Sequence, residues 1–149
     1  MISSHKGPIS RLLVVAVLSL QASACTQPTP VRVTVAADRG WQNSHIKIEA
    51  DDPFEIEYIS GTWTHWIAEV APFGPGGGAY TCNGSACCEP LPGTASGALI
   101  GKVGDETFSI GLGGPFTVDT MGSLFLRLND CDNALSDNQG SVIIEVVPQ

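Results

Sequence analysis

The sequence has little of what marks nucleic-acid-binding or membrane-spanning proteins. Only 15% of its 149 residues are charged, and seven Lys and Arg stand against fifteen Asp and Glu, for a net charge of −8. A surface so poor in basic groups repels phosphate backbones, which argues against nucleic acid as a partner. The longest apolar run, at 12–20 ("LLVVAVLSL"), is far shorter than the roughly 20 residues that a membrane-spanning helix needs.

Other features are absent as well. No window after the first 24 residues has the apolar periodicity of a helix of normal length, and no internal repeat is visible. Catalysis needs a nucleophile, a base and an orienting group, and no such trio stands out. We therefore expect a protein that is not an enzyme.

The chain begins with the pattern of an export signal. Basic residues precede the apolar run, and small residues follow it in "QASAC". This order is typical of a signal peptide, so we expect residues 1–24 to be removed. The loss of Lys6 and Arg11 would leave 125 residues with a net charge of −10. A chain of that length can bury a single core.

The cleavage site allows two outcomes. "ASA" before Cys25 suits a freely secreted protein, whereas "ASAC" resembles a bacterial lipobox, whose Cys is lipidated, although Ala22 stands where Leu is usual. Lipidation of Cys25 leaves an even set of cysteines for an oxidising compartment, namely Cys82, Cys87, Cys88 and Cys131. We favour a cell-envelope lipoprotein, at the outer membrane or cell surface, over a freely secreted one. Residues 25–30 then form an anchor and short linker.

Residues 31–149 read as one all-β domain. Apolar and polar residues alternate with a period of two at 45–49, 54–58, 124–129 and 142–147, and further strands are expected at 31–36, 63–70, 97–103, 107–111 and 116–118. The separators include "DDP", "SGT", "GD", "GGP" and "MGS". Short strands at this spacing predict an antiparallel β-sandwich with one buried face per sheet.

Residues 72–93 interrupt this pattern with six Gly and four Pro and no alternation. Loops of that length in compact domains are usually functional or disordered. The nearby cysteines argue that this one is tied down. A vicinal Cys87–Cys88 bond would be strained, which favours Cys82 bonded to one of these two and Cys131 to the other. A zinc site from these thiols and His65 is disfavoured, since regular Cys-x2-Cys spacing is lacking.

Between the last two predicted strands, six side-chain oxygen donors crowd into ten residues: Asn129, Asp130, Asp132, Asn133, Asp137 and Asn138. The segment does not match an EF-hand, because Leu135 and Ser141 occupy the positions of its Gly and Glu. From pattern alone, both a solvated turn and a hard-cation site fit.

Four segments, in order, resemble the PA-I type galactophilic lectins, a family of bacterial β-sandwich lectins that hold galactose through calcium. They are "GWQNSHIKIEADDPFEIEYISGTW", "GALIGKVGDETFSIG", "GSLFLRLND" and "DCDNALSDNQGS". Position by position, the resemblance implies Ca²⁺ bound by the side chains of Asp130, Asp137 and Asn138 and by the carbonyls of Ala134 and Trp66. The first three would also touch the sugar. Asp137 stands where the family has an amide.

The resemblance thus implies a galactose-binding-domain-like or jelly-roll-like sandwich and calcium-dependent binding of a galactose-type glycan. Oligomers are possible, and membrane contact is expected only through a lipid anchor. In the family the segment corresponding to 72–93 supplies further sugar contacts, for which only Tyr80, Asn83 and Glu89 are available here. The alternative function is a calcium-stabilised structural or protein-interaction module of the envelope that binds no sugar.

Overall fold

The computed structural model describes residues 29–66 and 71–148. Within that part of the chain, no helix is long and apolar enough to cross a membrane. The elements, in chain order, are β1 (Val31–Ala36), β2 (Gln42–Ile48), β3 (Phe54–Thr64), β4 (Leu99–Val103), β5 (Glu106–Ser109), β6 (Gly113–Phe116), β7 (Gly122–Leu128), the 3-10 helix η1 (Leu135–Asp137) and β8 (Gln139–Pro148).

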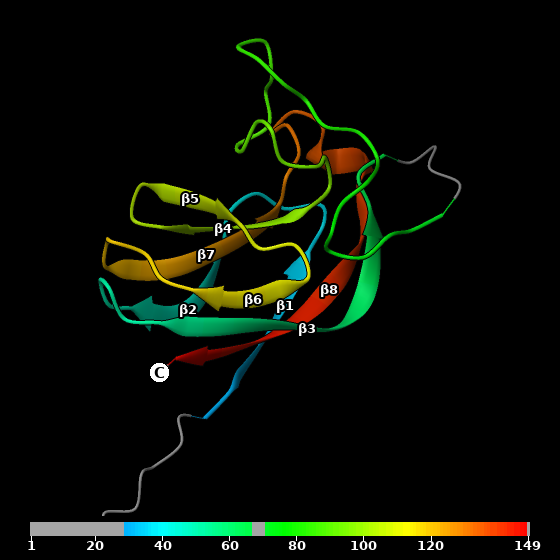
Figure 1. The fold of residues 1–149 in the computed structure, drawn as a ribbon. Coiled ribbons are helices and arrows are strands. Elements are labelled where there is room, and N and C mark those ends of the chain that lie inside the picture. Colours follow the sequence, from blue (N-terminus) through cyan, green and yellow to red (C-terminus); the bar gives the residue numbers. More distant parts are fainter. Residues whose placement is uncertain (1–28, 67–70, 149) are drawn as a thin grey trace, which may run out of the picture.

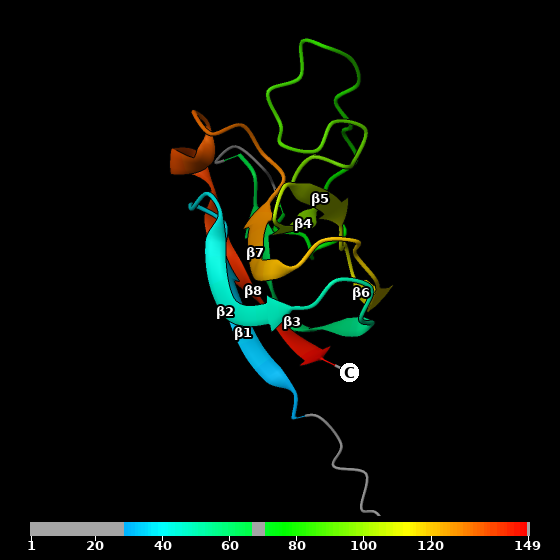
Figure 2. The ribbon, with the colours of Figure 1, turned by 90° about the vertical axis from the view of Figure 1, so that its left-hand side faces the viewer.

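Two four-stranded sheets pack against each other, as the two views of the ribbon show (Figure 1, Figure 2). One has the strand order β1-β8-β3-β6 and the other β2-β7-β4-β5. All of their strand pairs are antiparallel. The predicted antiparallel β-sandwich is therefore confirmed.

The core forms where one face of each sheet meets the other. Along β3, Phe54 and Ile56 are buried while Glu55 and Glu57 are exposed. In β7 the alternation places three fully buried leucines, Leu124, Leu126 and Leu128, on the inner face. Each such side chain contributes about 1.5–3 kcal/mol by leaving water. The period of two seen in the sequence therefore reflects sheets with one buried face.

Two glycine-containing segments expected to separate strands lie inside strands instead. The register of β3 against β8 shifts between Tyr58 and Ser60, and Gly61 follows with φ +97 against the backbone of Ser141. Gly113 in β6 has φ +101 and lies against the carbonyl of Ile56. A side chain would collide with backbone at both places, so glycine permits close strand contact here rather than ending the strand.

Two other strands were predicted with the wrong boundaries. The strand expected at 63–70 ends at Thr64, with 67–70 outside the described residues, and the strand expected at 116–118 is replaced by β6 at Gly113–Phe116. The remaining predicted strands are present within a few residues.

One end of the sandwich carries the long loop, residues 72–93, and the acidic turn, residues 129–138. β7 ends there at Leu128 and β8 begins there at Gln139, next to Thr64 at the end of β3. In Figure 1 the long loop (green) and the acidic turn (orange) lie together, at the end opposite the C-terminus. We call this the loop end. β1 starts at the other end, because Val31 pairs with Val146.

Candidate functional site

The acidic turn, residues 129–138, separates its six oxygen-bearing side chains into groups with different surroundings. Asn129 is fully buried and faces the long loop, whereas Asp132 and Asn133 are exposed. Asp130 and Asn138 are buried and in contact, and Asp137 directly precedes Asn138. Two of the three side chains that the resemblance assigns to a cation, Asp130 and Asn138, are therefore in contact, and the third belongs to the residue just before Asn138.

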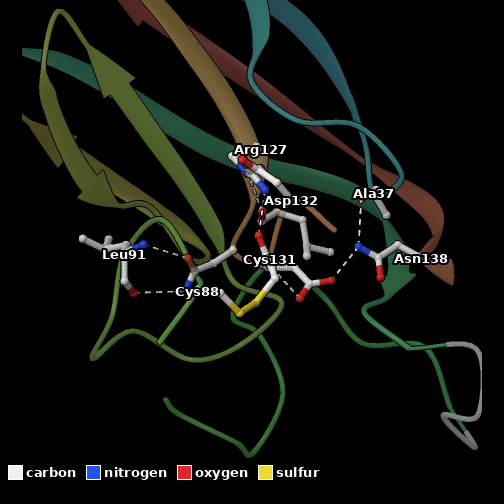
Figure 3. Close-up of polar contacts among 10 residues, drawn as sticks. Ala37, Cys88, Leu91, Arg127, Cys131, Asp132 and Asn138 are labelled. Atoms are coloured by element: carbon white, nitrogen blue, oxygen red, sulfur yellow. Dashed lines mark hydrogen bonds and ion pairs between the residues drawn. A yellow bond between two sulfur atoms is a disulfide. The ribbon is translucent and has the colours of Figure 1, made fainter. Parts of the chain in front are cut away.

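Asp130 and Asn138 form the centre of this group. One carboxylate oxygen of Asp130, Oδ1, accepts a hydrogen bond from the Cys131 N–H at 2.7 Å. The other, Oδ2, accepts one from Nδ2 of Asn138 at 3.0 Å. Nδ2 of Asn138 also donates to the Ala37 carbonyl at 3.2 Å (Figure 3). With its amide nitrogen used in this way, Asn138 has its oxygen left as an acceptor.

Two oxygens of this group are buried without a donor. Oδ1 of Asp137 and Oδ1 of Asn138 receive no hydrogen bond from any described residue. A buried acceptor left unpaired costs about 1–3 kcal/mol, more if it is charged. Such atoms call for a further partner such as water or an ion. Carboxylate and amide oxygens of this kind are ligands that a hard cation prefers.

The two carbonyls that the resemblance suggests as ligands belong to residues at the same end of the sandwich as the acidic turn. Ala134 directly precedes η1. Its carbonyl accepts a 3.3 Å hydrogen bond from the Asp137 N–H, and a carbonyl oxygen has a second lone pair for another partner. Trp66 lies two residues beyond Thr64, which pairs with Gln139 and accepts a 3.2 Å hydrogen bond from its N–H. The β3–β8 pairing therefore brings Trp66 to the same end of the sandwich as Asn138.

Sequence reasoning missed the role of Arg127, whose side chain is 1% exposed. Its guanidinium donates to the Leu128 carbonyl at 3.1 Å, the Asp130 carbonyl at 2.7 Å and the Asp132 carboxylate at 2.6 Å. Its Cζ lies 5.5 Å from the centre of the Trp41 ring. Arg127 therefore fixes the backbone of the turn from the sheet side. Its alternating position in β7 was visible in sequence, but its partners were not.

Two disulfides organise the long loop. Cys82 pairs with Cys87 within the loop, and Cys88 pairs with Cys131 in the acidic turn, with Cα atoms 5.8 and 5.1 Å apart. Figure 3 shows the second bridge joining the loop to the turn. The framework favoured from sequence, Cys82 with one of the vicinal pair and Cys131 with the other, is present. Because these thiols are consumed, the zinc alternative has no thiolate ligands.

The amide of Asn129 attaches the same loop a second time. Its Oδ1 accepts the Leu91 N–H at 3.1 Å, and its Nδ2 donates to the Leu91 carbonyl at 3.1 Å. Of the loop residues considered for ligand contact, Tyr80 and Asn83 are exposed, whereas Glu89 is buried and accepts a hydrogen bond from Ser96. Glu89 therefore packs inside the loop rather than pointing into solvent.

The ligand atoms available at the acidic turn favour some cations over others. Among residues 29–66 and 71–148, no cluster of three or more His, Cys, Asp or Glu side chains has metal-binding geometry. A site here must therefore use the amide of Asn138 and backbone carbonyls besides two carboxylates. An all-oxygen set of this kind fits Ca²⁺, which accepts carboxylates, amides and carbonyls in flexible geometry, better than zinc.

Comparison with known proteins finds similarity to solved structures but not to any family model or curated protein. No protein-family model matches the chain, and no curated protein matches it. Among solved structures, the N-terminal domain of EclA, described as a PllA-like lectin, superimposes with a TM-score of 0.63. Identity is 20%, and the alignment covers 79% of this chain and 95% of that domain. The chain thus has a lectin-like β-sandwich fold.

Proposed function

We propose that this protein binds Ca²⁺ at the acidic turn and, through it, a galactose-type glycan. The ligands would be the side chains of Asp130, Asp137 and Asn138 with the carbonyls of Ala134 and Trp66. The observation that carries the proposal is the pair of buried, unpartnered oxygens, Oδ1 of Asp137 and Oδ1 of Asn138. Neither oxygen has a donor among residues 29–66 and 71–148, and a bound cation would serve as the partner of both.

The charge of the turn supports a divalent ion. Asp130 is 7% exposed and Asp137 has one oxygen fully buried, so two carboxylates are partly removed from water. Arg127 donates to the Asp130 backbone carbonyl, but its carboxylate partner is Asp132, which lies outside the proposed ligand set. Among the described residues, no Lys or Arg side chain is paired with either of these two carboxylates, which favours a cation as their partner.

Sugar recognition would follow from the chemistry of the bound ion. Calcium supplies open coordination positions that two vicinal sugar hydroxyls can occupy in place of water. The same hydroxyls can donate to Asp130, Asp137 and Asn138, so the site would read their relative orientation. Galactose offers O3 and O4 in such an arrangement. Support comes from the sequence resemblance and from the lectin fold of the EclA domain.

Thermal unfolding of residues 26–149 with intact disulfides tests the proposal. The protein is measured in EDTA, in calcium, and in calcium with galactose. A ligand of the native state alone stabilises it by about 2.7 kcal/mol when present at about 100 times its Kd. We expect a rise in Tm with calcium and a further rise with galactose but not with glucose, whose O4 points the other way.

The pattern of shifts separates the alternatives. A calcium shift without a sugar shift favours the structural or protein-interaction module, in which the ion only rigidifies the loop end. If calcium has no effect on Tm or on measured heats of binding, the acidic turn is an ordinary solvated turn and the proposal is wrong.

A further inference from the structure

We propose that the Cys88–Cys131 disulfide is a positioning element of the calcium site, so that calcium affinity depends on the redox state of this one bridge. The inference rests on the proposed function and adds to it a role for residues that bind no ligand. It starts from the unequal placement of the two disulfides. One closes a short ring inside the loop, with a sequence separation of 5, and the other spans 43 residues to the acidic turn.

Cys131 stands between two of the proposed ligands. Its N–H holds Oδ1 of Asp130 at 2.7 Å, and its carbonyl accepts the Ala134 N–H at 2.9 Å. The bridge to Cys88 fixes this residue from the loop side. The orientation of the Asp130 carboxylate and the start of η1 are therefore both set by the backbone of a disulfide-bonded residue.

The constraint continues to the buried amide. Oδ2 of Asp130 accepts a hydrogen bond from Nδ2 of Asn138, which fixes the orientation of the Asn138 amide. The oxygen of that amide has no donor among the described residues. Within the described part of the chain, Cys82 and Cys87 form no hydrogen bond with the turn, and the carbonyl of Cys82 instead accepts the Gly93 N–H within the loop at 2.9 Å. Only the Cys88–Cys131 bridge thus lies on the path to the ligands.

Loss of the bridge should leave the fold intact. The Asn129 amide still holds the loop at Leu91, and Phe73 remains paired with Trp63 at the loop's start. Partners that orient metal ligands typically account for 10–100-fold in metal affinity. We therefore expect the double variant Cys88→Ser/Cys131→Ser to bind calcium at least about tenfold more weakly.

The matched control is Cys82→Ser/Cys87→Ser. It also removes two sulfur atoms and one disulfide of the long loop, but it leaves the bridge to the acidic turn intact. We expect its calcium Kd, measured by titration calorimetry well below Tm, to stay within about twofold of the unsubstituted protein. Both variants will have lower Tm in EDTA, so a merely stabilising bridge would lower Tm without changing the Kd of the folded protein.

Linkage gives a second test on the unsubstituted protein. If the bridge raises calcium affinity by some factor, calcium must oppose reduction of the bridge by the same factor. In a glutathione buffer, two glutathione thiols form one glutathione disulfide as Cys88 and Cys131 gain two electrons and two protons. Alkylation of the thiols followed by peptide mapping measures each pair separately.

We expect saturating calcium to lower the reduction equilibrium constant of Cys88–Cys131 by about tenfold or more and to leave that of Cys82–Cys87 unchanged. Equal calcium affinity in both double variants, or equal protection of both bridges, would overturn the inference while the calcium site stands. Absence of calcium binding by the unsubstituted protein would overturn the site itself.

Discussion

Asp137 is the residue whose charge is most informative to remove. In Asp137→Asn the shape and one oxygen remain, but calcium loses one of two carboxylates. Since ligand charge tunes calcium affinity over orders of magnitude, we expect Kd to rise by about tenfold. In EDTA the variant should unfold at higher temperature, because an amide in place of a carboxylate with a buried, unpaired oxygen removes a cost of about 1 kcal/mol.

Asp105→Asn is the charge-matched control for this variant. Asp105 is exposed in the turn between β4 and β5, at the end of β4 opposite Leu99 and the loop end. Its removal should change neither the calcium Kd nor the Tm in EDTA. Equal effects of the two substitutions would show that overall charge, and not the site, controls calcium binding.

Arg127 tests whether the turn is held from the sheet side. In Arg127→Lys a single ammonium replaces a fork that reaches two carbonyls and a carboxylate. At least one buried carbonyl then loses its donor, at a cost of about 1–3 kcal/mol. We expect the urea midpoint to fall accordingly, with the slope unchanged. An unaltered midpoint would mean that water replaces the guanidinium at no cost.

Among the elements, β3 depends on a glycine that the sequence pattern treats as a break. Gly61→Ala would place a methyl group against the carbonyl of Ser141 at φ +97. Gly111→Ala is the control, because Gly111 has φ +56 and open space around it. A left-handed conformation alone costs about 1–2 kcal/mol, so we expect that loss in urea unfolding for Gly111→Ala and a clearly larger one for Gly61→Ala.

Sequence patterns predicted the strands well wherever alternation is regular. Leu124, Leu126 and Leu128 identify β7 because one face of a sandwich sheet must be apolar. The strand boundaries predicted at Gly61 and Gly113 were wrong. Glycine is needed at these positions because the backbone of a strand distant in sequence lies close by. Local composition cannot distinguish a glycine that ends a strand from one that permits such contact.

The candidate site was predictable to the extent that it lies within one turn. Asp130, Asp137 and Asn138 are close in sequence, so their crowding was visible. The roles of Arg127 and Asn129 were not, because they depend on partners such as Trp41 and Leu91 that only the folded sheets bring near. Partners from the remote strands and loop thus escaped the sequence analysis.

At the scale of the whole molecule, the proposed lipid anchor at Cys25 can be tested directly. We expect the bacterially expressed protein to incorporate labelled palmitate and to partition into detergent, and Cys25→Ser to lose both properties while its calcium Kd stays the same. Partition of the unsubstituted protein into the aqueous phase without label would instead support free secretion.

The two ends of the sandwich give the domain a mechanical direction. β1 starts at Val31, at the end opposite the acidic turn, and its residues up to Ala36 pair with β8, which begins beside Asn138. A tether pulling on Val31 and a glycan pulling on the turn would draw β1 and β8 in opposite directions along their length. Antiparallel hydrogen bonds lie perpendicular to the strands, so such a load is shared in shear across the whole ladder instead of peeling it bond by bond. Adhesion under flow would then load this sheet along its strands, the direction in which its hydrogen bonds resist together.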